Sequence, residues 1–433
     1  MVQPSAKNKL YGWLVIFVCF LIMALQFAPT ATLPGLFVTS LTQEFDTTRT
    51  AVNFSLTIGV LAALFGMMVF SRAYTRFKLR QIMPFLLIIC AGTYFITYFV
   101  TNIIQFYVVS AVRGFFAAGL NSLPISIIVN NWFGAGSRGK AVGIAMAGSG
   151  VGSMIFSPVT GLVIDTFGWR WGYMLFGAMC IVLLPLILIF FVQTPEEKGY
   201  IKIGQSEQEQ LAAAAHQETG ISAARAVRTA AFWFAILSLL LLSGASQTWN
   251  NNAASYLGDI GISPVAAASI LSFTSLGIIV GKLGLGAISD KFGIKTSMLM
   301  GSAFYLGTYI FCIVISRVPA LAPAPAILAG LGMSICTIAP TILAGALFGN
   351  KDYAIIIGYF QMGSSLGSSL IPLAMTLVYD LTGSFMTAWY IAIGISLLSA
   401  VAILVVFAKS KHLTDDPLPT TTSAGATPSP QGG

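Results

Sequence analysis

The amino-acid sequence predicts an all-α membrane protein in which twelve transmembrane helices form two six-helix pseudo-repeats. Composition is the first reason: of 433 residues, 56 % are hydrophobic and only 8 % are charged, whereas soluble domains carry roughly 25 % charged residues. The second reason is that glycine-rich apolar runs of about 20 residues, the length of a bilayer-spanning helix, recur along the chain. The third is a repeat of glycines and charges at a constant offset of 215 residues.

Each apolar run is expected to form one helix. Helices and closed barrels are the structures that satisfy every backbone hydrogen bond within lipid, and the runs lack the alternating pattern of a membrane β-barrel. The twelve expected spans cover residues 11–37, 50–71, 81–101, 103–131, 139–164, 169–193, 230–257, 264–289, 294–316, 320–347, 353–379 and 385–408.

The basic residues predict the side of the membrane on which each end of the chain lies. Seventeen of the 22 Lys and Arg residues precede the first run or follow an even-numbered run, whereas Arg49, Arg170 and Arg317 lie on the other side. By the positive-inside rule, both termini and the central loop are expected to be cytoplasmic, in a cell membrane. Topology therefore explains the net charge of +8, and no nucleic-acid partner is expected.

The internal repeat indicates that six helices were duplicated. An even number of spans in each half makes the halves parallel repeats about an axis along the membrane normal. The small-residue clusters at 143–152 and 358–370 correspond in the two halves, and we expect them to pack the fifth and eleventh helices at a moving interface. The matching pairs include Gly66 with Gly281, Arg76 with Lys291, Phe133 with Phe348, Gly148 with Gly363, Gly152 with Gly367 and Asp165 with Asp380.

Composition divides the chain into four parts. The first apolar run is long enough to span the membrane, so we expect it to stay as the first helix and not to be removed as a signal peptide. The last stretch is polar and rich in Pro, Gly, Ser and Thr, as in disordered segments. The expected parts are an N-terminal six-helix half at 1–193, a cytoplasmic linker at 194–229, a C-terminal six-helix half at 230–409 and a disordered cytoplasmic tail at 410–433.

The residues that usually carry catalysis or metal binding are not grouped in this sequence. The five cysteines are scattered singly through apolar runs, with neither disulfide nor metal spacing. The two histidines, His216 and His412, fall in the linker and the tail. No nucleophile elbow or phosphate-binding glycine loop is present, because the glycine clusters lie inside apolar runs. We therefore expect no enzymatic activity, no catalytic residues, no metal and no cofactor.

Two basic residues, Lys282 and Arg113, lie inside apolar runs. A Lys or Arg at the bilayer centre costs about 2.5–3.5 kcal/mol on insertion scales, so each needs a reason. All fourteen acidic residues fall in loops, in the tail or at helix ends, which makes an anionic substrate the simplest counter-ion for Lys282. The alternatives are that Lys282 reaches the interface or pairs with Asp290, although about 12 Å of helix rise separates those two residues.

Arg113 has two open interpretations, which are binding of a carboxylate and satisfaction of the backbone carbonyls of a neighbouring helix. Other polar residues in the apolar runs are candidates for lining a substrate pathway, and hydrogen bonding between helices explains each of them equally well. These residues are Gln26, Asn53, Asn121, Gln247, Asn250, Tyr359 and Gln361.

The stretch "GLGAISDKFGIK" (284–295) resembles the loop signature of the major facilitator superfamily. In that family the acidic and basic residues of the loop join two helices at the cytoplasmic face and separate when the transporter opens inward. The first-half copy, "AYTRFKLR" (73–80), has Thr75 and Lys78 where the signature has Asp and Gly, so a weaker latch is expected there. The resemblance implies a cytoplasmic gate at Gly286, Asp290, Lys291, Gly293, Lys295, Arg76 and Arg80.

Three further stretches are similar to the branch of monocarboxylate porters and oxalate/formate exchangers: "YGWLVIF" (11–17), "PISIIVNNWFGAGSRGKAVGIAMAGSGVG" (124–152) and "FGWRWGYMLFG" (167–177). That branch carries small organic anions, and a basic residue on helix eight, eight positions before the loop Asp, binds the substrate carboxylate. The matching position is Lys282. The oxalate/formate exchanger has a second cation on helix eleven, where Phe360 stands in this chain, so a monocarboxylate is favoured unless Arg113 is the second cation.

The resemblance implies alternating-access transport of monocarboxylates of the lactate, pyruvate or formate type, by a carrier that is a monomer by family default. The helix-eight Asp of proton-coupled monocarboxylate porters is replaced by Ile278. Three coupling modes therefore stay open: anion exchange, facilitated diffusion, and symport of a proton carried between substrate and Lys282. A dicarboxylate exchanger is the alternative substrate class. Drug efflux is a weaker alternative, because no intramembrane acid is present for a cationic drug.

Overall fold

The structure is a computed structural model, and it describes residues 6–200, 202–203, 221–349 and 352–414. Twelve helices in the described part are long and apolar enough to cross a bilayer, which confirms the predicted number. The described residues form helices and their connections, with an isolated bridge between Phe133 and Ile203. The N-terminal half comprises α1 (Ala6–Ile22) continued by η1 (Met23–Phe27) and α2 (Ala28–Ala31), α4 (Arg49–Arg76), α5 (Leu79–Thr97), α6 (Ile103–Ala117) continued by η3 (Ala118–Leu120) and α7 (Ser122–Trp132), α8 (Ala135–Phe167), and α9 (Trp169–Phe190).

The C-terminal half repeats this arrangement with less interrupted helices. Its spans are α12 (Ala230–Asp259), α13 (Pro264–Phe292), α14 (Ile294–Ile315), α15 (Pro323–Phe348), α16 (Tyr353–Thr382) and α17 (Phe385–Thr414). The short connecting elements of the chain are η2 (Pro34–Phe37), α3 (Val38–Glu44), η4 (Pro195–Lys198), α11 (Ala223–Ala226) and η5 (Pro319–Leu321).

Local sequence explains several helix boundaries. The Asn102 side chain accepts from the backbone N–H of Gln105 at the start of α6, and Thr229 caps α12 in the same way, as short polar side chains do at helix N-termini. The turns that follow α8 and α13 contain Gly168 and Gly293, whose φ angles are +88° and +82°. Only glycine adopts such angles without steric cost, so these turns end one helix and begin the next within a residue or two.

Buried apolar side chains form two separate clusters, one within residues 15–203 and one within residues 223–406. Glycines at nearly corresponding positions, Gly114 and Gly330, show the same packing in both halves. A Cβ on Gly114 would lie 2.1 Å from the carbonyl oxygen of Gly59, and a Cβ on Gly330 would lie 2.0 Å from that of Thr274. The repeat seen in the sequence is therefore also a repeat of close helix contacts.

The small-residue clusters of α8 and α16 pack within each half and also at the contact between the halves. A Cβ on Gly152 would lie 2.1 Å from the carbonyl oxygen of Ala24 in η1, and Gly367 meets the backbone of Leu240 in α12 in the same way. These glycines thus bring helices together within one half. The helices α8 and α16 also contact the other half, through α13 and α4 respectively. Both clusters take part in these contacts: a Cβ on Gly150 would lie 2.8 Å from Ile279 of α13, and Ser369 accepts a hydrogen bond from Thr57 of α4.

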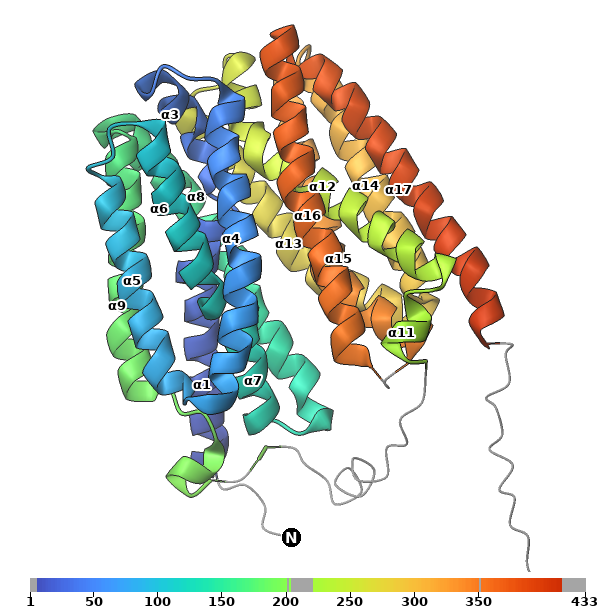
Figure 1. The fold of residues 1–433 in the computed structure, drawn as a ribbon. Coiled ribbons are helices and arrows are strands. Elements are labelled where there is room, and N and C mark those ends of the chain that lie inside the picture. Colours follow the sequence, from blue (N-terminus) through green and yellow to red (C-terminus); the bar gives the residue numbers. More distant parts are fainter. Residues whose placement is uncertain (1–5, 201, 204–220, 350–351, 415–433) are drawn as a thin grey trace, which may run out of the picture.

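Figure 1 shows the two halves meeting near the end that carries α3 and spreading apart towards the end that carries α7 and α11. We call these ends of the molecule the α3 end and the α11 end. Where the halves meet, α8 lies beside α13 and α4 lies beside α16. The region between these helix pairs contains the candidate site.

Candidate functional site

Lys282 lies on α13 at the contact between the halves. Its Nζ donates hydrogen bonds to the carbonyl oxygen of Met146, 3.3 Å away, and to the hydroxyl of Ser149, 3.2 Å away. Both acceptors belong to α8 in the N-terminal half. The half-buried ammonium therefore bridges the two halves and is not turned towards a membrane interface.

Both acceptors of Lys282 are neutral. In the described part of the chain, the ion pairs join Arg49 to Asp259, Lys78 to Glu197 and Arg170 to Glu44, and none involves Lys282. The side chain of Asp290, the other expected partner, lies outside the described residues. An ammonium among neutral acceptors at this depth is costly, and a bound anion would remove that cost.

A small cavity between the halves lies about one helical turn from Lys282, towards the α3 end. Two residues of the cavity wall show this spacing. Ile278 precedes Lys282 by four residues, and Ser153 follows Ser149, the hydrogen-bond partner of Lys282, by four residues. The cavity volume that the centre of a water molecule can occupy is about 10 Å³. This is room for about one water, so the two halves are nearly closed around the cavity. The wall consists of Thr32, Leu33, Ser153, Ser157, Asn250, Leu271, Thr274, Ser275 and Ile278.

Hydrogen bonds through this wall link the halves and order the polar groups. The hydroxyls of Thr32 and Ser153 are 2.6 Å apart. Ser157 Oγ donates to the carbonyl oxygen of Ala268 on α13 at 2.7 Å. The sequence interpretation missed these serines because it treated their glycine-rich stretch as packing alone. Their four-residue spacing, which puts Ser149, Ser153 and Ser157 on one helix face, was the available signal.

Asn250 is the expected pathway residue that the structure brings to this cavity. Its Nδ2 donates to Gln247 Oε1 at 3.0 Å, and Gln247 Nε2 donates to the carbonyl oxygen of Ala31 in the other half at 3.4 Å. Asn53 instead donates to the carbonyl oxygen of Arg49 on its own helix. Asn250 and Gln247 therefore belong to the inter-half polar network, whereas Asn53 serves α4 locally.

Arg113 lies elsewhere, among helices of the N-terminal half. Its guanidinium carbon is 5.0 Å and 5.2 Å from the ring centroids of Tyr94 and Tyr173. Its nitrogens donate to the hydroxyls of Thr97 and Ser110 at 3.4 and 3.3 Å. These partners lie on α5, α6 and α9, so the structure shows an aromatic and hydroxyl environment for Arg113. The structure does not bring Arg113 together with Lys282.

Gln26 is buried and Asn121 is half-buried in the same half. Gln26 Oε1 accepts from the thiol of Cys180 at 3.0 Å, whereas its Nε2 and the Oδ1 of Asn121 find no hydrogen-bond partner within the described residues. Neither residue lines the cavity beside Lys282. Their place is in the packing of the N-terminal half.

The helix-eleven candidates Tyr359, Phe360 and Gln361 lie near the α11 end of α16. Phe360 is completely buried against the rings of Phe232 and Phe348, and Tyr359 is 44 % exposed. None of the three lines the cavity. Aromatic core packing in the C-terminal half thus accounts for Phe360, the position matched to the exchanger's second cation.

The expected gate residues are only partly described. Gly293 forms the left-handed turn between α13 and α14, and Lys295, Arg76 and Arg80 are exposed. Arg80 donates to the carbonyl oxygen of Leu188 at 2.8 Å, which ties α5 to α9 within one half. The surroundings of Gly286 and the side chains of Asp290 and Lys291 lie outside the described residues.

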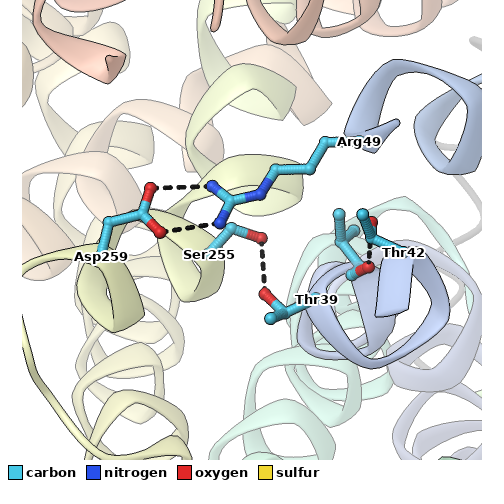
Figure 2. A network of polar contacts seen from close by, with 6 residues as sticks. Thr39, Thr42, Arg49, Ser255 and Asp259 are labelled. Carbon is cyan, nitrogen blue, oxygen red and sulfur yellow. Dashed lines mark hydrogen bonds and ion pairs between the residues drawn. The ribbon is translucent and has the colours of Figure 1, made fainter. Parts of the chain in front are cut away.

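The α3 end contains an inter-half cluster that the sequence interpretation missed, because it treated these charges as loop residues. Figure 2 shows the Arg49 guanidinium at the start of α4 paired through two nitrogens with both carboxylate oxygens of Asp259 on α12, at 2.8 and 2.7 Å. The guanidinium carbon lies 4.3 Å from the Tyr379 ring centroid on α16. Beside it, Thr39 donates to Ser255 at 3.2 Å.

A second carboxylate strengthens this end. Asp380 on α16 accepts from the backbone N–H of Thr50 at 2.9 Å, and this N–H lies in the first turn of α4, where helical N–H groups have no partner within the helix. We call Arg49, Asp259, Asp380, Thr39 and Ser255 the α3-end latch. It joins the two halves through charge-assisted bonds.

Known proteins resemble this chain over lengths from about half to most of it. Monocarboxylate transporter 13 of Bos taurus is 23 % identical over 403 residues, which cover 91 % of this chain and 89 % of that protein. Sialic acid transporter NanX of Escherichia coli (strain K12) is 23 % identical over 203 residues, 46 % of each chain. A crystal structure of nucleoside transporter NupG, 15 % identical, has a TM-score of 0.70 and covers 92 % of this chain and 99 % of its own, which supports the fold.

The family model described as Major Facilitator Superfamily matches residues 13–322 and 237–430. Together with the twelve spans, the two repeated halves and transporters as relatives, this match identifies a multi-pass membrane transporter. The chain belongs to the major facilitator superfamily.

Proposed function

We propose that this protein is a secondary transporter of small organic anions, with monocarboxylates as the substrate class, and that the substrate carboxylate binds the ammonium of Lys282. One observation supports this most directly. The ammonium lies between the halves and contacts only the neutral acceptors Met146 and Ser149 in the described part of the chain. An arriving carboxylate replaces these weak acceptors with a charge-assisted bond, which is roughly twice as strong as a neutral one.

The proposed cycle is alternating access by a monomer in the cell membrane. The excess of basic residues assigns the α11 end and both termini to the cytoplasm. The latched α3 end and the spread α11 end then correspond to a carrier that is open towards the cytoplasm. In the outward-open state the α3-end latch would be broken, and the α11 ends of the halves would meet.

The placement of Arg113 supports a monocarboxylate over a dicarboxylate. Arg113 is enclosed by Tyr94, Tyr173 and hydroxyls of its own half, so it offers no second charge beside Lys282. Two of the relatives are named for monocarboxylates and for sialic acid. Both names denote carboxylic acids, which agrees with an anion at Lys282.

The proposed coupling is anion exchange or proton-linked symport. Ile278, one turn before Lys282, is buried and cannot relay a proton. An empty carrier would move an unneutralised ammonium through the closed state, at the energetic cost of a charge in the membrane. That cost favours return of the carrier with a second anion bound, or with the lysine deprotonated.

Transport by the purified full-length protein in liposomes tests the proposal. Uptake of labelled lactate is measured with unlabelled lactate inside, and separately into empty vesicles with an acidic exterior. Uptake that needs internal anion indicates exchange, and uptake driven by the pH gradient indicates symport. We expect Lys282→Gln to lower uptake by at least about tenfold and Lys282→Arg to retain more activity, because Arg keeps the charge.

Lys409→Gln is the matched control, because Lys409 is an exposed lysine at the end of α17, far in sequence from the cavity wall. Equal uptake by the wild type, Lys282→Gln and Lys409→Gln would refute binding at Lys282. Thermal unfolding of each variant in detergent distinguishes loss of binding from loss of fold.

A further inference from the structure

We propose that the cavity wall beside Lys282 selects carboxylates that also carry hydroxyl groups on the neighbouring carbons. This inference rests on the proposed function, since it takes Lys282 as the carboxylate site. It goes further by assigning a second set of contacts and naming a narrower substrate class, the hydroxylated monocarboxylates.

The composition of the wall is the first observation. Six of its nine residues carry a hydroxyl or an amide, and only Leu33, Leu271 and Ile278 are apolar. Small-molecule pockets are usually lined mainly by apolar and aromatic side chains, with few polar groups. A wall that is two-thirds polar, at the centre of a chain that is 56 % hydrophobic, is suited to a ligand with several hydrogen-bonding groups.

The wall also has hydrogen-bonding capacity to spare. A hydroxyl donates once and accepts twice. Thr274 Oγ1 accepts from Trp249 Nε1 at 3.0 Å, and within the described residues its own O–H has no acceptor. The hydroxyl of Ser275, in the same wall, has no hydrogen-bond partner there either. These groups can bind substrate hydroxyls without first breaking a bond to the protein.

Geometry relates the wall to the lysine. Ile278 lies one helical turn before Lys282, and Ser153 lies one helical turn after Ser149, which accepts from the ammonium. One turn of α-helix rises about 5.4 Å. A ligand whose carboxylate meets Lys282 therefore extends its neighbouring carbons towards the wall, with Ser153 as the nearest wall residue on α8. Hydroxyls on those carbons would form hydrogen bonds with the wall. An alkyl chain would leave the polar groups of the wall without partners, and sites built to bind hydroxyls bind such ligands far more weakly.

Three anions of equal length and charge test this inference: propionate, lactate and glycerate have three carbons and one carboxylate, with zero, one and two hydroxyls. Apparent dissociation constants come from the rise in melting temperature of the purified full-length protein with anion concentration. We expect glycerate to bind at least about tenfold more tightly than propionate, with lactate between them.

Two wall variants, Ser153→Ala and Asn250→Leu, locate the effect. Each is expected to reduce the affinity ratio of glycerate to propionate by at least about threefold. Ser238→Ala is the control, because this buried serine lies on α12 with Asn250 but bonds to Ala235 and is absent from the wall. Thermal unfolding of each variant without anion shows whether the variant is folded.

The outcomes separate this inference from the proposed function. If the three anions bind equally and Lys282→Gln weakens all of them, the carboxylate site stands and hydroxyl selection is overturned; the wall then holds only packing contacts and a water. If no anion binds and Lys282→Gln changes nothing, the proposed function fails, and the inference fails with it. A variant that does not fold leaves the wild-type series to decide.

Discussion

The two ends of the molecule are joined in different ways. At the α3 end, the paired charges of Arg49 and Asp259 connect the halves, with the Tyr379 ring over the guanidinium and Asp380 on the first turn of α4. Towards the α11 end, the ribbons of the two halves spread apart (Figure 1). Lys282 and its cavity lie between the two ends.

Glycines of α8 and α16 show the same difference on a finer scale. A Cβ on Gly152 or Gly367 would overlap a backbone carbonyl of the neighbouring helix, whereas Gly143 and Gly358, nearer the α11 end, have no atom within 4 Å of an added Cβ. Packing of these stripes is therefore tight at mid-helix and absent at the α11 end. In the proposed cycle, the contact between the halves moves from one end to the other.

The largest expected effect comes from making the α3 end permanent. The hydroxyl oxygens of Thr39 and Ser255 are 3.2 Å apart across the halves, so Thr39→Cys with Ser255→Cys is expected to form a disulfide. Cross-linking should reduce lactate exchange in liposomes to background, and a reductant should restore it. Each single cysteine variant is the control, and full exchange by the cross-linked protein would contradict a moving α3 end.

A smaller effect is expected from weakening the latch. Arg49→Gln removes a bidentate pair whose side chains are 12 % and 32 % exposed, and after allowance for screening we expect about 1 kcal/mol less stabilisation of the latched state. Ser255 is buried, so Ser255→Cys reports opening. Labelling of this cysteine by a membrane-impermeant maleimide should rise about fivefold.

Arg317, an exposed arginine after α14 at the same end, provides the matched control. Arg317→Gln should leave the labelling rate of the Ser255→Cys background unchanged. The charge exchange of Arg49→Asp with Asp259→Arg should return labelling towards the original rate. Equal labelling with and without Arg49 would show that the pair does not hold the halves together.

An effect on stability, and not on the opening of the halves, is expected from two glycines on α8. Gly152→Ala would place a methyl 2.1 Å from the carbonyl oxygen of Ala24, and such overpacking costs about 1–3 kcal/mol. The methyl that Gly143→Ala adds would meet no atom, and Ala favours a helix more than Gly does. This variant should therefore stabilise the protein by at most about 1 kcal/mol. Thermal unfolding in detergent measures the stability of both variants. Equal shifts in melting temperature would contradict tighter packing at mid-helix than at the α11 end.

Much of the fold follows from the sequence alone. Lipid requires every backbone hydrogen bond to be made within the segment, so each apolar run of about 20 residues became a helix, and the count of twelve is confirmed. The offset of 215 residues matches Gly152 with Gly367, and each of these glycines packs closely against a backbone carbonyl of another helix in its own half. Lys282 could be singled out because a charge inside an apolar run is costly wherever that run packs.

Tertiary structure decided which faces meet. Helical periodicity shows that Ser149, Ser153 and Ser157 share a face, but only the packing of α8 on α13 places that face beside Lys282. Arg113 is enclosed by rings from two other helices. Arg49 finds Asp259 at a separation of 210 residues. Local sequence determines a helix and its polar faces, whereas partners distant in sequence are chosen by how the helices pack, which no local pattern encodes.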